Sequence, residues 1–124
     1  MDDYLGILIE QSLRDPAIAS ELNIQAVKRG IQWTLLLVSV PERDLASHVD
    51  RIQSNLADDG TWYAHYFRGS ELVVVYRDAV FSVSTDPASW RPAVQHGIAL
   101  GIPKEQLDYA PRTRDTAMQY FSGR

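Results

Sequence analysis

The chain of 124 residues contains no cysteine. This absence excludes a disulfide framework, a thiolate zinc site and a cysteine nucleophile, and it is compatible with a reducing cytoplasm. Glycine and proline are also scarce, with 7 and 6 copies, while 45% of the residues are hydrophobic and 23% are charged. This composition is typical of an ordinary folded protein and excludes the disordered and fibrous classes.

Long hydrophobic runs and excess basic charge are missing as well. Apolar runs such as Leu35 to Val38 are far shorter than the roughly 18 residues needed to cross a bilayer. The N-terminus lacks the basic start and apolar stretch of a secretory signal. Twelve Lys and Arg against 16 Asp and Glu give a net charge of −4, which disfavours binding to nucleic acid. We therefore expect a soluble, cytoplasmic protein that does not bind membranes.

The first part of the chain predicts two helical pieces. Asp2 or Asp3 can cap the first, because a carboxylate there accepts the free amide protons of the opening turn. Its apolar positions at helical spacing are Leu5, Leu8, Ile9 and Leu13. Asp15-Pro16 interrupts this pattern and is also a good helix start, so a short second helix is expected to about Leu22.

Two strands, a helix and three further strands are expected next. Residues 24–28 and 31–40 read as strands around the Arg29-Gly30 turn, and the second is apolar on both sides, as in a central strand. The helix after Pro41 has one apolar stripe and ends at Asp58-Asp59-Gly60. The stripe consists of Leu45, Val49, Ile52 and Leu56. The later strands are 61–68, 71–77 and 80–84, arranged as an antiparallel meander.

A last helix is predicted after Asp86-Pro87, with Gly101 closing it in the left-handed conformation. One further turn is expected over residues 103–107. Together these elements predict an α+β domain on a largely antiparallel sheet of about five strands, with helices packed mainly on one face. We expect a single domain over residues 1–109 and a C-terminal tail over residues 110–124, either helical or flexible.

Three segments carry a resemblance to a known family. They are an aromatic strand, a valine-rich hairpin and a closing signature, written here as Trp62-Tyr63-Ala64-His65-Tyr66-Phe67, Leu72 to Phe81, and Gly101-Ile102-Pro103-Lys104-Glu105-Gln106-Leu107-Asp108-Tyr109. The chain resembles a family of small uncharacterised prokaryotic proteins that share these segments. The resemblance covers about Leu8 to Tyr109 and implies structure only, since no activity or catalytic residue comes with it.

The aromatic segment 62–67 supplies the candidate site. Strand alternation places Tyr63, His65 and Phe67 on one face, opposite the other three residues of the segment. If those three point into the core, the first three form a ring-lined surface for a planar ligand or a partner, with Tyr76 nearby. Alternatively, this second face is covered by the first helix, the tail or another subunit.

Histidines are the natural starting point for acid–base chemistry near neutral pH. His48 flanks the apolar stripe of its helix and His96 lies off the stripe of its own, and both are interpreted as partly exposed packing residues. This leaves His65 as the candidate proton-transfer group. Asp58-Asp59 reads as a turn, and Glu105 and Asp108 as capping or ion-pairing residues. No hydrolase, zinc-protease, phosphate-loop or dinucleotide motif occurs, and we therefore assign no metal, no cofactor and no catalytic residue.

Two functions stay open. The first is a non-enzymatic interaction module, which pairs with itself as a homodimer or with another protein through a sheet face, because several strands look covered on both sides while few helices are predicted. The alternative is a small-ligand-binding domain or an unassigned enzyme, with Tyr63, His65 and Tyr76 near a pocket. A single-stranded nucleic acid stacked on Tyr63 and Phe67 is disfavoured by the net charge of −4.

Overall fold

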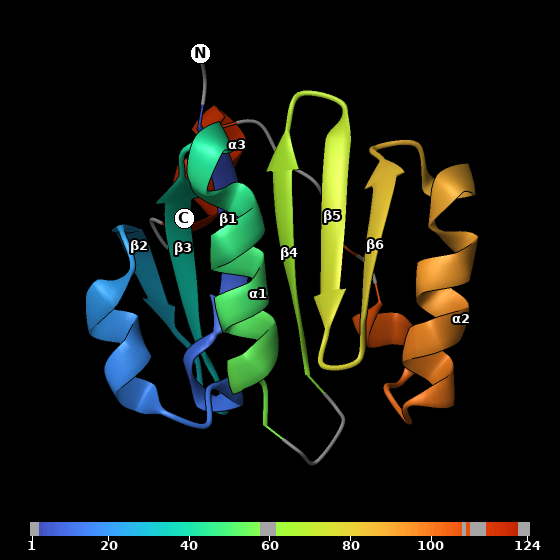
Figure 1. The fold of residues 1–124 in the computed structure, drawn as a ribbon, viewed down its shortest axis with the longest axis horizontal. Helices are drawn as coiled ribbons and strands as arrows, with labels where there is room; N and C mark the ends of the chain where they lie inside the picture. The colour runs from blue at the N-terminus through green and yellow to red at the C-terminus, as the bar shows by residue number, and fades with distance from the viewer. Residues whose placement is uncertain (1–2, 58–61, 108, 110–113, 122–124) are drawn as a thin grey trace.

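The protein is a six-stranded antiparallel sheet with helices on both sides (Figure 1). This computed structural model describes residues 3–57, 62–107, 109 and 114–121. The strands lie in the order β2-β3-β1-β4-β5-β6. Their bounds are Tyr4–Ile9 (β1), Ile24–Arg29 (β2), Thr34–Val40 (β3), Tyr63–Arg68 (β4), Glu71–Tyr76 (β5) and Ala79–Ser84 (β6). The helices are Leu45–Asn55 (α1), Arg91–Ala99 (α2) and Arg114–Phe121 (α3). The predicted α+β class is confirmed, with six strands in place of five.

The sixth strand is β1, which the sequence pattern wrongly predicted as a helix. β1 lies between β3 and β4, and its residues are almost all buried. Because both sides of β1 are covered, its sequence is a continuous apolar run without strand alternation, and such a run is indistinguishable from a helical stripe. Glycine is required at position 6 of β1, because a Cβ there would overlap the ring of Tyr66.

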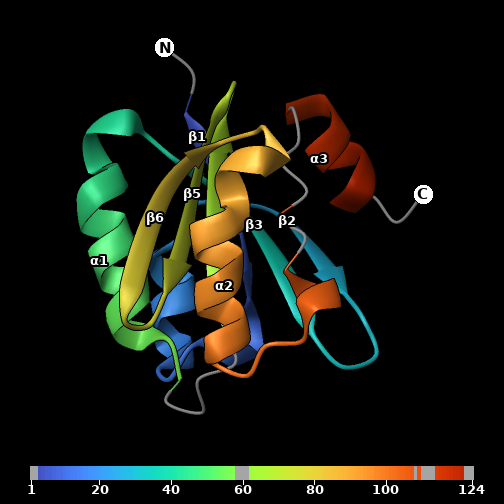
Figure 2. The ribbon, with the colours of Figure 1, turned by 90° about the vertical axis from the view of Figure 1, so that its right-hand side faces the viewer.

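Each face of the sheet has its own hydrophobic cluster. On one face α1 and the 3₁₀ helix Pro16–Glu21 cover residues that include Leu8, Leu36 and Tyr66. On the other face α2, α3, residues 102–107 and Tyr109 cover residues that include Leu37, Phe67 and Tyr76. Figure 2 shows α1 on one side of the sheet and α2 and α3 on the other.

The expectation that helices pack mainly on one face is therefore corrected. The apolar strands β3, β4 and β5 require cover on both faces, and α2 together with residues after Gly101 covers the second face. Ile102, Leu107, Ala117 and Phe121 are buried in that cluster. These residues carry too little periodicity in the sequence to predict a packed layer.

Several local predictions are confirmed. Asp15 accepts a hydrogen bond from the Ala17 amide, and Asp86 accepts one from Ala88, so both Asp-Pro pairs begin 3₁₀ helices. Gly101 has a φ of 94° and follows α2 as the left-handed closing residue. The α1 stripe buries Val49 and Ile52.

Other expectations fall on residues that the structure does not describe. The Asp58-Asp59-Gly60 turn, a cap at Asp2 and the role of Asp108 all lie outside the described residues. Within the part that is described, no helix has both the length and the apolar character that crossing a bilayer requires.

Candidate functional site

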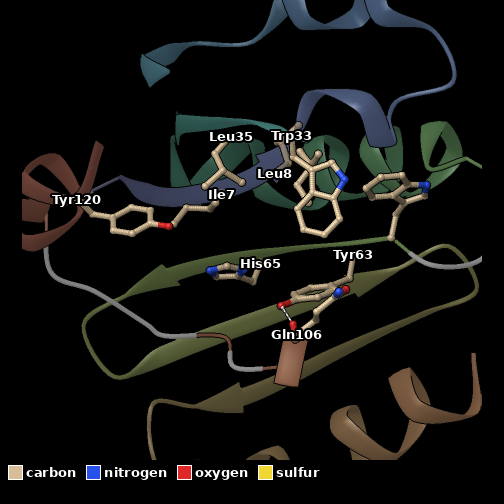
Figure 3. A pocket seen from close by; sticks show the side chains of 10 residues that line it. Ile7, Leu8, Trp33, Leu35, Tyr63, His65, Gln106 and Tyr120 are labelled. Atoms are coloured by element: carbon tan, nitrogen blue, oxygen red, sulfur yellow. Dashed lines mark hydrogen bonds between the residues drawn. The ribbon is translucent and has the colours of Figure 1, made fainter. Parts of the chain in front are cut away.

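A cavity of about 260 Å³ lies at one end of the sheet, where β1, β3 and β4 run side by side (Figure 3). We call it the ring cavity because aromatic side chains make up much of its wall. The described residues that line it are Ile7, Leu8, Ile9, Trp33, Leu35, Trp62, Tyr63, His65, Gln106 and Tyr120.

The register of the sheet brings the first of these side chains together. His65 of β4 is directly opposite Ile7 of β1, and directly paired residues of an antiparallel ladder point to the same side. Ile9 is paired with Leu35 of β3 in the same way, and Tyr63 lies two positions before His65. The neighbouring strands thus form a mainly apolar floor with the imidazole of His65 in it.

Segments from the C-terminal part of the chain form the other walls. The Tyr63 hydroxyl donates a hydrogen bond of 2.6 Å to the carbonyl of Gln106, at the end of the 3₁₀ helix Lys104–Gln106. Figure 3 shows Tyr120 extending from α3, with its hydroxyl directed towards Ile7 and His65. The polar groups among the lining residues are therefore His65, the amide of Gln106, the hydroxyls of Tyr63 and Tyr120, and the indole N–H groups of Trp33 and Trp62.

His65 is held in place by rings on both sides along its strand. The residue is only 8% exposed, and the centroid of its imidazole ring lies 6.1 Å from the ring centroids of both Phe67 and Tyr63. Tyr109 adds a third ring at 6.4 Å. Such packing fixes the orientation of the imidazole at the cavity.

The four residues proposed from sequence are divided by the structure. Tyr63 and His65 line the ring cavity, whereas Phe67 and Tyr76 are buried beneath the C-terminal segments and are not among the lining residues. The Tyr76 hydroxyl donates to the carbonyl of Ala93 at 2.8 Å and accepts from the Tyr109 hydroxyl at 2.7 Å. Burial raises the pKa of Tyr76, so this phenol stays protonated and serves packing.

Several other lining residues carry no local sequence pattern that marks them as part of a site. Trp33 lies before β3 and meets Trp62 edge-on, with ring centroids 6.0 Å apart. Tyr120 belongs to a segment without a clear apolar stripe, and Gln106 enters through a 3₁₀ turn. These residues lie beside β4 only because of tertiary packing, which no local sequence pattern predicts.

A second hollow of about 490 Å³, here called the outer groove, adjoins the ring cavity. Trp33, Leu35 and Tyr120 line both. The other described residues of the outer groove are Lys28, Gly30, Ile31 and Gln32. The two hollows thus share a wall made of the β2–β3 connection, β3 and α3.

The remaining histidines are engaged elsewhere. The Nε2 atom of His48 is hydrogen-bonded to the Tyr66 hydroxyl at 2.7 Å, and burial together with the nearby Arg51 lowers the His48 pKa to about 4. His96 contacts Asp78 at 2.7 Å, and this hydrogen bond lowers the pKa of the Asp78 carboxyl. Neither histidine lines the ring cavity.

Metal chemistry finds no support within the described residues, where no three His, Asp or Glu side chains gather around one point. Comparison of the chain with known protein families, curated proteins and solved structures finds no match.

Proposed function

We propose that this protein is a small-ligand-binding domain and that the ring cavity is its binding site. The main support for this proposal is that four ring-bearing side chains line one cavity of about 260 Å³. They are Trp33, Tyr63, His65 and Tyr120. Binding sites for small molecules are typically concave and mainly apolar, with a few polar groups that fix orientation. The ring cavity has these properties, and its volume suits a molecule of one or two fused rings.

The arrangement favours an aromatic ligand. Rings stack or meet edge to face with centroids about 4.5–7 Å apart. The aromatic pairs around the cavity already use this range, as for Trp33 with Trp62 at 6.0 Å and Tyr63 with His65 at 6.1 Å. A planar guest between them would extend the same packing, while Gln106 and His65 offer hydrogen-bonding groups.

The cover of the second sheet face weakens the case for an interaction module. That hypothesis depended on strands that look covered on both faces in a chain with few helices. In the structure α2, α3, residues 102–107 and Tyr109 cover the second face from within the chain. A partner is therefore not needed to bury Phe67 and Tyr76.

The test is binding of 2-naphthol, followed by saturation-transfer NMR, with two tryptophan variants. Ile9→Trp adds a ring at a lining position, whereas Val80→Trp adds one on β6, away from the cavity. We expect the wild type and Val80→Trp to bind and Ile9→Trp to lose binding by tenfold or more, that is about 1.4 kcal/mol. No binding up to about 1 mM, or equal binding by Ile9→Trp, would overturn the proposal.

Self-association through β2 is a second candidate, favoured by one specific observation. β2 forms one edge of the sheet, and Ile24 and Val27 on it are 37% and 40% exposed. An edge strand with exposed apolar side chains is a template for pairing with a further strand. This candidate places the partner at the edge of the sheet rather than on its face.

A further inference from the structure

The outer groove contains a cation whose charge the described structure does not neutralise. Lys28 is half-buried on β2, and its ammonium donates to the Tyr120 carbonyl at 3.1 Å. The ammonium also lies 4.2 Å from the centroid of the Tyr120 ring. Among the residues that the structure describes, no carboxylate lies within ion-pair distance of Lys28.

The absence of a described counter-ion at Lys28 is a clue to the charge of the ligand. The chain carries a net charge of −4, and the described ion pairs engage other cations, such as Arg51 with Glu21 and Arg68 with Glu71. This ammonium is partly desolvated and, among the described residues, contacts only a neutral carbonyl and an aromatic ring. Binding of an anion beside it would therefore be favourable in free energy. The outer groove gives an anion access to this position.

The sheet register places Lys28 on the same side as the ring cavity. Lys28 is paired with Leu35, which lines both hollows. Tyr120 also lines both, and its ring is in contact with the ammonium. The Tyr120 side chain therefore extends from the ring cavity to the ammonium of Lys28.

We infer that the ligand is an aromatic monocarboxylate with a short arm. Its ring occupies the ring cavity beside His65 and Tyr63, and its carboxylate passes Tyr120 to reach Lys28 in the outer groove. This inference rests on the proposed function, because it names the chemical class of ligand for the same site.

A single negative charge fits better than a phosphate. The Tyr120 carbonyl belongs to the last turn of α3, where the helix dipole is negative and disfavours a dianion. Lysine offers one point charge and lacks the planar fork with which arginine holds phosphate groups. Arg29, the next cation along β2, points to the opposite side of the strand by alternation.

The test compares 2-naphthylacetate with 2-naphthylacetamide, two probes of nearly the same shape that differ in charge, by isothermal titration calorimetry on the full chain. We expect the wild type to prefer the acetate by at least about fivefold, as a charge-assisted hydrogen bond would provide. Lys28→Met, which keeps the aliphatic stem, should lose this preference while still binding the amide.

Two further variants complete the design. Lys28→Arg should retain the preference because it restores the positive charge, and Arg29→Met should retain it because that cation faces away from the groove. A thermal melt of each variant checks that α3 is still docked, since unfolding would weaken both probes equally.

The outcomes separate the inference from the proposed function. If both probes bind the wild type equally, or if Lys28→Met keeps the preference for the acetate, the inference is wrong while the ring cavity stands as a binding site. If neither probe binds, and 2-naphthol also fails to bind, the proposed function itself is wrong.

Discussion

His48 shows how one side chain can make the stability of this protein depend on pH. It lies on α1, on the face of the sheet opposite the ring cavity, and its Nε2 atom is hydrogen-bonded to the buried Tyr66 hydroxyl. Burial and the nearby Arg51 lower its pKa from the ordinary 6.5 to about 4. The folded protein therefore favours the neutral imidazole, whereas the unfolded chain takes up a proton more readily.

The sign of the effect follows from this difference. Above pH 6.5 the imidazole is neutral in both states and the stabilisation is fully present; it is lost as the pH falls from 6.5 towards 4. We expect the free energy of unfolding to fall by about 1–2 kcal/mol over this window, less than the full shift implies because His48 is partly exposed.

The matched variant is His48→Gln, which does not titrate yet can still bond to the Tyr66 hydroxyl. Urea unfolding of both proteins at several pH values isolates the contribution of His48 from that of other groups. Parallel pH profiles for the two proteins would show that His48 does not carry the dependence.

Among the elements, α2 meets the side chains of Tyr76 and Leu107 through two small residues. Ala93 and Gly97, four residues apart, are its buried positions, and these small residues allow the Tyr76 hydroxyl to reach the Ala93 carbonyl. A Cβ on Gly97 would lie 2.7 Å from the Tyr76 hydroxyl and 2.6 Å from the Leu107 side chain. The packing of α2 against Tyr76 and Leu107 therefore requires a residue without a side chain at position 97.

Gly97→Ala sets two effects against each other. Alanine favours a helix interior by about 1 kcal/mol over glycine, while overpacking a core costs about 1–3 kcal/mol. Because the Tyr76 hydroxyl is fixed by two hydrogen bonds, we expect the clash to prevail, with a net loss of about 1–2 kcal/mol in chemical denaturation. In a Leu107→Ala background the same change should cost less, and a stabilised Gly97→Ala single variant would contradict the packing described.

The elements also differ in how well the sequence predicts them. α1 has a single apolar stripe and the two Asp-Pro pairs have a local capping mechanism, so both were predicted correctly. β1 was missed because burial on both faces removes the alternation that identifies a strand. The reason is physical. A strand is recognised by the alternation between a buried and an exposed face, and β1 has no exposed face.

The candidate site shows the same limit. Tyr63 and His65 follow from alternation along one strand, so the sequence alone places them on a common face. Trp33, Gln106 and Tyr120 reach the cavity only through tertiary packing of β3, a 3₁₀ turn and α3. Roughly the β4 wall of the cavity was predictable, and the walls from other segments were not.

At the scale of the whole molecule, the two edges of the sheet provide a matched pair for testing self-association. Val27 on β2 and Val80 on β6 are 40% and 41% exposed. If β2 pairs with a second copy, Val27→Lys should abolish the dimer and Val80→Lys should leave it intact, since an edge lysine opposes strand pairing. Sedimentation analysis at about 100 µM measures both, and a monomeric wild type would exclude this candidate.

The central position of β1 has a consequence for how the chain folds. The hairpin β2–β3 and the meander β4–β5–β6 each consist of neighbours in sequence. In the described sheet their strands are joined only by pairing with β1, whose residue Leu5 pairs with Ser39 on one side and Phe67 on the other. Each half can form early from local contacts, whereas joining them requires closure of a long loop, which is the slower kind of event. During synthesis β1 is made first among the strands but gains its second neighbour only when β4 has been translated, so until then one edge of β1 exposes unpaired backbone N–H and C=O groups to chaperones and to other nascent chains.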